Sequence, residues 1–130
     1  MPTLKNERGQ ALVEFALALP LLAVLLLGVV QLGNVFNNYE TITDAARAGS
    51  RQAILLRLSG GSPSTAEAAV RAAASGLDPD KLGVSVQATP DWATSGNDVH
   101  VTVTYPYSID LLGWVVQSGN LTSTMTERLE

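Results

Sequence analysis

The sequence contains no cysteine, a single histidine and few charged residues. Without cysteine, the chain can form no disulfide framework, thiolate metal site or cysteine nucleophile. His100 cannot supply a multi-histidine metal site by itself. Charged residues make up 15% of the chain, whereas soluble domains average roughly 25%. Because the sequence also offers no catalytic triad or metal cluster, we expect no enzymatic activity and no cofactor.

The charges that are present have the wrong sign for nucleic acid. Eight Lys and Arg against twelve Asp and Glu give a net charge of −4. A nucleic-acid partner is not expected, because phosphate groups are bound by clustered basic side chains. The aspartates lack the regular spacing of a calcium loop, and turns account for them better. They are Asp78, Asp80, Asp91, Asp98 and Asp110.

One long apolar run dominates the sequence. Residues 15–39 contain no charged side chain, and residues 15–33 are the most apolar part. As a helix, residues 15–33 would be about 28 Å long, which matches the roughly 30 Å hydrocarbon core of a bilayer. A buried core helix is the alternative, but the rest of so short a chain could not cover it on all sides. We therefore predict a membrane span over about residues 15–36. It contains Phe15, Pro20, Gly28 and Gly33.

A secretory signal peptide is a second interpretation of the same run. Lys5 and Arg8 supply a basic start, but the run is longer than the roughly 7–15 apolar residues of a signal peptide. No small-x-small cleavage site follows it directly, so we expect the anchor to be retained. Because the next basic residue is Arg47, the positive-inside rule places the N-terminus in the cytoplasm and the bulk of the chain outside.

Beyond residue 39 the pattern becomes amphipathic, which predicts that the helix continues. Apolar or small residues recur at helical spacing: Ile42, Ala45, Ala46, Gly49, Ala53 and Leu56. We predict one helix over residues 10–58, kinked at Pro20 and ended by the paired glycines that follow. Arg47 and Arg51 either pair with Glu40 or Asp44 on a solvated face or form an anion-docking patch, and the first is favoured.

The C-terminal part predicts a small α+β head over residues 59–130. A second helix is expected to start at Ser62-Pro63 or at Ser64 and to end at Gly76. Valines alternating with polar residues then predict short strands, over about 84–87, 99–105 and 121–125. We expect a three-stranded antiparallel sheet packed on the outer half of the long helix.

Four aromatic residues of the head leave two interpretations open. Trp92, Tyr105, Tyr107 and Trp114 could form an adhesive surface or pack in the core. Aromatic side chains bury large areas when they fold into a core, so core packing is favoured.

The residues before the apolar run carry the most specific motif. Residues 8–15 read RGQALVEF. They resemble the processing site of type IVb prepilins, in which a glycine ends a short basic leader. In those prepilins a glutamate and an aromatic residue stand at positions five and six of the mature chain. With residues 44–49, DAARAG, and residues 121–125, LTSTM, the chain resembles the TadE-like family of pilus assembly proteins.

This resemblance implies a pseudopilin of a bacterial Tad (Flp) adhesive pilus. The protein would reside in the inner membrane with its head outside, and in an extracellular filament as a further location. A prepilin peptidase would cut between Gly9 and Gln10 and remove the leader, residues 1–9. The implied partners are the lipid membrane, other pilin-like subunits through helix packing, the peptidase and secretion platform proteins. The alternative is an uncleaved single-pass anchor whose head is a binding or scaffold module of a secretion system.

The resemblance also makes Glu14 and Phe15 assembly residues. A carboxylate at the centre of a membrane helix costs about 2.5–3.5 kcal/mol, and less near the edge. Cleavage would create a positive amine at Gln10, about one helical turn away. In a bundle of staggered helices, Glu14 of one subunit could meet the Gln10 amine of its neighbour and relieve the desolvation of both groups. In the alternative, Glu14 simply reaches the headgroup layer.

Overall fold

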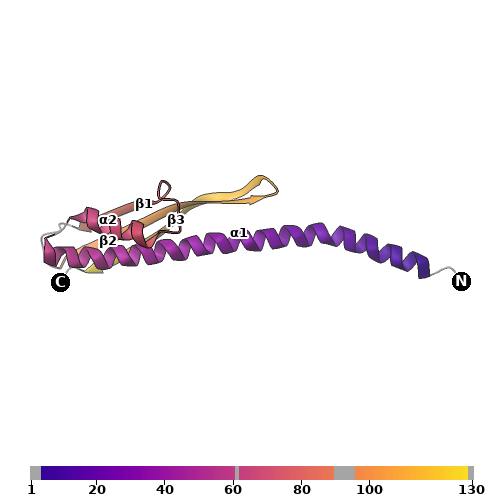
Figure 1. Ribbon diagram of the computed structural model, residues 1–130, viewed down its shortest axis with the longest axis horizontal. Coiled ribbons are helices and arrows are strands. Elements are labelled where there is room, and N and C mark those ends of the chain that lie inside the picture. Colours follow the sequence, from indigo (N-terminus) through magenta and orange to yellow (C-terminus); the bar gives the residue numbers. More distant parts are fainter. Residues whose placement is uncertain (1–3, 61, 90–95, 129–130) are drawn as a thin grey trace.

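The computed structural model describes residues 4–60, 62–89 and 96–128 of the chain. The elements follow in the order α1 (Leu4–Ser59), α2 (Pro63–Ala73), β1 (Gly83–Thr89), β2 (Asp98–Leu111) and β3 (Trp114–Arg128). The predicted α+β class is confirmed, with a long N-terminal helix, one further helix and a three-stranded antiparallel sheet. Figure 1 shows α2 and the sheet beside the C-terminal half of α1, whose other half extends away from them.

The helix α1 contains 56 residues and is therefore about 84 Å long. It begins at Leu4 rather than at the expected Gln10, so that Gly9 lies within the helix. Pro20 is also inside α1, where the helix stays continuous although its N-terminal part bends away from the axis of the rest (Figure 1). The helix ends before Gly60, whose φ of 71° is the left-handed conformation that favours glycine after a helix.

The helix α2 is held by turns at both ends. Its N-cap is Ser62 with Pro63 at the first helical position, which selects the first of the two predicted starts. It ends at Ala73, before the expected Gly76, and the N–H of Ala74 donates to the carbonyl of Val70 at 2.9 Å. A further turn then brings Leu77 against the core, which explains the early end.

The strands are paired in the order β1-β2-β3. The pairing of β1 with β2 runs from Thr89 opposite Asp98 to Gly83 opposite Thr104. The pairing of β2 with β3 continues well beyond this, to Leu111 opposite Trp114. The outer part of β2 and β3 is therefore a two-stranded hairpin. Pro106 lies in this outer part, where β2 has no neighbour on the β1 side. A proline, which lacks the N–H, is tolerated at such an open edge.

This hairpin is longer than the sequence predicted. The expected strands 99–105 and 121–125 cover only its inner part, because β2 extends to Leu111 and β3 begins at Trp114. The connection has only two residues, Leu112 with φ 53° and Gly113 with φ 86°. Positive φ at both positions is typical of a type I′ turn, which usually carries Asn-Gly. With leucine in the first position, the sequence pattern did not mark a turn here.

The core lies where α2 and the sheet pack on the C-terminal half of α1. Its fully buried members are mostly small or β-branched, including Ile42, Ala45, Ala46, Ala53, Ala66, Val70, Val99, Val101 and Val103. Gly49 lies at the closest approach. A Cβ atom there would overlap Cγ2 of Val70 and would lie 3.1 Å from Cγ1 of Val101. The absence of a side chain at Gly49 therefore lets α1 contact both α2 and β2.

Candidate functional site

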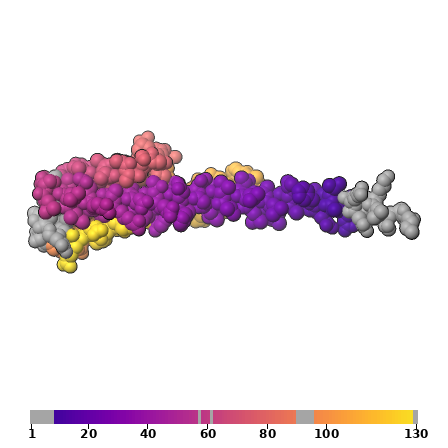
Figure 2. All heavy atoms as spheres, turned by 60° about the horizontal axis from the view of Figure 1, so that its bottom comes forward, coloured from indigo at the N-terminus to yellow at the C-terminus, as the bar shows by residue number. Residues whose placement is uncertain are grey.

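The N-terminal part of α1 over residues 9–23 is a bare and mostly apolar surface. Every residue from 9 to 23 is exposed, and Leu17 reaches 74% exposure. Figure 2 shows this half of α1 extending beyond the head as a single helix. Among the described residues, one helix is long and apolar enough to cross a membrane, and its most apolar window is 0% buried. A core helix would be mostly buried, so this exposure favours a membrane anchor.

The motif residues lie at the N-terminal end of this surface. Gln10 and Glu14 are one turn apart, and Nε2 of Gln10 donates to Oε1 of Glu14 at 3.2 Å. Phe15 is exposed, and no described residue beyond its neighbours in α1 comes within 4 Å of the position that a Cβ of Gly9 would occupy. The structure thus brings Gln10 and Glu14 together on one helix face. The cleavage and assembly roles of these four residues stay predictions.

The predicted span residues lie on different sides of α1. Pro20 and Gly33 are exposed, whereas Gly28 is half-buried. Half-buried positions recur every three or four residues along one face, at Val24, Gly28, Gln31, Val35 and Asn38. Gln31 identifies this face as the one toward the β2–β3 hairpin, since its Nε2 donates to the backbone carbonyl of Asp110 at 2.5 Å. The hairpin therefore reaches a level of α1 that lies within the predicted span 15–36.

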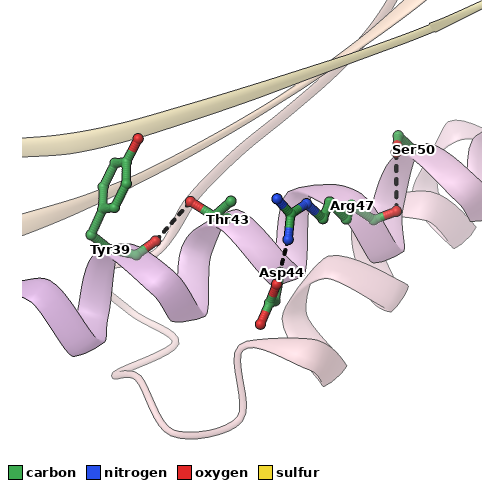
Figure 3. Close-up of polar contacts among 5 residues, drawn as sticks. All are labelled: Tyr39, Thr43, Asp44, Arg47 and Ser50. Carbon is green, nitrogen blue, oxygen red and sulfur yellow. Dashed lines mark hydrogen bonds and ion pairs between the residues drawn. The ribbon is translucent and has the colours of Figure 1, made fainter.

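The second motif, residues 44–49, lies where the head packs on α1. Its small residues Ala45, Ala46 and Gly49 face the core, and its two charged residues face outward. Arg47 Nη1 is 3.1 Å from Asp44 Oδ1, with both side chains largely exposed (Figure 3). This confirms the predicted ion pair of Arg47 on a solvated face. The motif is thus explained by close packing on one side and solubility on the other.

Backbone carbonyls of α1 accept bonds from hydroxyls on the same stretch of helix. Oγ1 of Thr43 donates to the carbonyl of Tyr39 at 2.8 Å, and Oγ of Ser50 donates to that of Arg47 at 3.0 Å. Figure 3 shows the Tyr39 ring pointing from α1 toward the strands. A shallow groove lies along the same stretch of α1, lined by Phe36, Tyr39, Glu40, Thr43, Asp44 and Arg47.

Two further polar candidates of the head, His100 and Asp78, make contacts that are typical of structural roles. Nδ1 of His100 lies 2.9 Å from Oγ1 of Thr126 on the neighbouring strand. Oδ1 of Asp78 accepts from the backbone N–H of Asp80 at 3.1 Å, and its Oδ2 lies 3.6 Å from Nζ of Lys81, which is a turn arrangement. In the described part of the chain, no three acidic or histidine side chains gather to hold a metal ion. Asp91 lies outside the described residues.

The aromatic residues divide between the two interpretations. Tyr105 packs against the core, and its hydroxyl accepts a bond from the N–H of Asp78 at 3.4 Å. Tyr107 is half-buried over Gly119 of the paired strand. The expectation of core packing is wrong for Trp114, which is 81% exposed, because it stands at the far end of the β2–β3 hairpin, away from the core. Trp92 lies outside the described residues.

Comparison with protein families finds a similarity that lies within the long helix α1. Residues 9–51 match the family model of the TadE-like protein. This matched segment, about a third of the chain, is similar to TadE-like proteins. No curated protein and no solved structure matches the chain. The TadE-like segment begins at Gly9 and ends at Arg51, so it contains the bare apolar surface of α1 and the small residues that receive the head, but none of the sheet.

Proposed function

We propose that this chain is a pseudopilin, a structural subunit used in building a bacterial Tad pilus. Its TadE-like segment associates the chain with Tad pilus systems. The observation that carries the proposal is the bare N-terminal half of α1, which bears Gly9 and Glu14 at one end and the head at the other. Such a helix can act as an anchor before assembly and as a packing surface afterwards.

The exposed apolar side chains suit both states. Lipid tails and neighbouring helices are equally apolar, so moving α1 from lipid into a helix bundle loses little hydrophobic free energy. Association must then come from close packing and polar pairs. Gly33 offers a point of close approach, since no described residue beyond its neighbours in α1 comes within 4 Å of its missing Cβ.

Glu14 supplies the polar pair in this proposal. In the uncleaved helix its carboxylate accepts a bond from Gln10 of the same chain. Cleavage after Gly9 would turn the backbone nitrogen of Gln10 into a charged amine near the same helix face. A neighbouring subunit displaced by about one turn would bring its Glu14 to this amine, and the pair would fix the stagger of the subunits.

The position of Gly9 inside α1 bears on the cleavage step. A peptidase binds an extended backbone, so the helix must open around Gly9 before the bond is cut. Glycine is about 1 kcal/mol less favourable than alanine in a helix interior. Opening α1 at Gly9 therefore costs less than opening it at its neighbours, and the prepilin peptidase is proposed to act here on the cytoplasmic side.

Mass spectrometry of the protein from its native membrane tests the processing step. We expect the mass of a chain that has lost residues 1–9. The Gly9→Ser variant should accumulate at the full mass, whereas Gly33→Ser in the same helix should mature normally. An intact leader in the unmodified protein would contradict the pseudopilin proposal and favour the uncleaved scaffold module.

Piliation of a Glu14→Ala strain tests the assembly step. We expect normal insertion of the variant into the membrane and a severalfold loss from sheared filaments, measured with an antibody against the head. Glu127→Ala, which removes an exposed carboxylate from β3, is the matched control and should leave incorporation unchanged. Normal incorporation of Glu14→Ala would show that no subunit contact depends on this carboxylate.

A further inference from the structure

The end of the β2–β3 hairpin is an exposed apolar cap. Residues 111–116, here called the hairpin tip, read LLGWVV. The exposed fractions are 77% for Leu112, 81% for Trp114, 63% for Val115 and 61% for Val116. Polar residues border the tip on both strands, with Ser108 and Asp110 before it and Gln117 and Ser118 after it. Large apolar side chains gathered at one exposed end indicate contact with an apolar partner.

The hydrogen bond between Gln31 and Asp110 fixes the level of the tip along α1. Gln31 is also the first polar residue after Glu14. The rise from Glu14 to Gln31 is about 26 Å, close to the roughly 30 Å of a hydrocarbon core. With Glu14 at the cytoplasmic boundary, Gln31 therefore lies close to the outer boundary of the bilayer.

The tip extends from this level toward the N-terminal half of α1 (Figure 1). Leu112 follows Asp110 by two strand positions, or about 7 Å. This places Leu112 and Trp114 just inside the outer boundary, the depth to which interfacial segments enter a membrane. Trp is the residue type that favours this depth. The backbone carbonyl of Asp110, which would lose water there, already has Gln31 as its donor.

The turn residue gives an independent indication. Leu112 has a φ of 53°, a conformation in which Gly or Asn would be relaxed and leucine is strained. Leucine at this position makes the turn less stable than Gly or Asn would, and it adds apolar surface to the tip. Backbone strain of this kind is kept where it serves a function.

We propose that the hairpin tip inserts into the outer interface of the same bilayer that α1 spans. The partner is lipid, because the tip lies beside a stretch of α1 that is itself in lipid. The inference rests on the membrane anchor of the proposed function and not on pilus assembly. The head is then attached to the membrane at two places, through α1 and through the hairpin tip.

Tryptophan fluorescence of the full-length protein in phospholipid vesicles tests this inference. The chain has two tryptophans, so Trp92→Phe leaves Trp114 as the single reporter. We expect blue-shifted emission that is quenched by phospholipids brominated near the glycerol end of the acyl chain, and less by those brominated near the chain end. The control combines Trp92→Phe and Trp114→Phe with Thr122→Trp, at an exposed site on the same strand. Its emission should be red-shifted and quenched by aqueous iodide.

The outcomes separate the inference from the anchor on which it rests. Failure of the protein to float with vesicles would overturn the anchor itself. If the protein floats but Trp114 behaves like the control, the tip inference alone is overturned. Blue-shifted emission without bromolipid quenching would place the tip against a second protein copy and would also overturn the inference.

A second variant distinguishes lipid contact from a merely structural role of the tip. Leu112→Asn relaxes the turn and removes apolar surface. We expect the bromolipid quenching of Trp114 to fall by about half or more, while the thermal midpoint of the protein in detergent stays equal or rises. A lower midpoint with unchanged quenching would show that Leu112 serves folding, which would contradict the inference.

Discussion

The two halves of α1 belong to one helix but have opposite surroundings. In the N-terminal half, large apolar side chains such as Leu17 and Leu26 are exposed. In the C-terminal half, the buried positions are mostly small, as at Ala45, Ala46 and Gly49. Along α1, the large apolar side chains are therefore mostly exposed, and the buried side chains are mostly small.

The difference is the one expected when the head covers the C-terminal half and lipid covers the N-terminal half. The head needs small residues on α1, because the sheet and α2 approach the helix backbone closely at Gly49. Lipid tails are fluid and pack against side chains of any size. The N-terminal half of α1 can therefore carry leucine on all sides.

The largest difference between the two halves should appear when a lysine replaces one exposed leucine in each of them. Leu25 and Leu55 are similarly exposed, at 58% and 50%. A lysine at the centre of a membrane span costs about 2.5–3.5 kcal/mol. Leu25→Lys should therefore reduce the membrane-inserted fraction by more than tenfold in a cell fractionation assay.

Leu55→Lys is the matched control for this prediction. Its side chain points into water beside the head, where surface substitutions change stability by less than about 0.5 kcal/mol. The membrane-inserted fraction should stay unchanged. Equal behaviour of the two variants would remove the distinction between a lipid-covered and a water-exposed half of α1.

A smaller effect is expected from adding one methyl group to each half. The Cβ of Gly49→Ala would overlap the stiff, buried side chain of Val70. Overpacking of this kind costs about 1–3 kcal/mol, which should lower the thermal midpoint in detergent. Gly33→Ala meets open space and should be neutral or slightly stabilising, because alanine favours a helix. A neutral Gly49→Ala would show that the head does not pack tightly on α1.

The smallest effect concerns the ion pair beside the packed half. Arg47 and Asp44 keep 63% and 73% of their side-chain surface exposed, so their attraction is screened by water and salt. Arg47→Ala should change the free energy of unfolding by no more than about 0.5 kcal/mol. Denaturant titration at low and high salt measures this. A loss that persists at high salt would indicate that Arg47 does more than pair with Asp44.

The sequence predicted α1 well because its evidence is local. The apolar run, the spacing of small residues from Ile42 onward and the glycines after Ser59 each follow from neighbours in the chain. The inner strands were found for the same reason, since Val99, Val101 and Val103 alternate with polar residues.

The outer hairpin could not be found in this way. Pro106 and Gly119 weaken the strand pattern in the sequence, and the contacts that make them acceptable in a strand exist only in the folded chain. Pro106 faces an open edge, and the ring of Tyr107 covers Gly119, with Cε1 at 3.1 Å from where a Cβ would be. The exposed Trp114 was missed because its surroundings depend on a hairpin that the pattern did not show. Among the residues of the candidate site, helical spacing alone predicted the proximity of Gln10 and Glu14.

The continuity of α1 has a mechanical consequence. No loop interrupts the helix between Leu4 and Ser59, so a change of angle at one end is transmitted to the other. For a rod of about 84 Å, a tilt of roughly 10° displaces the far end by about 15 Å. A change of tilt at the N-terminal end would thus move the head sideways without any change in the fold of the head.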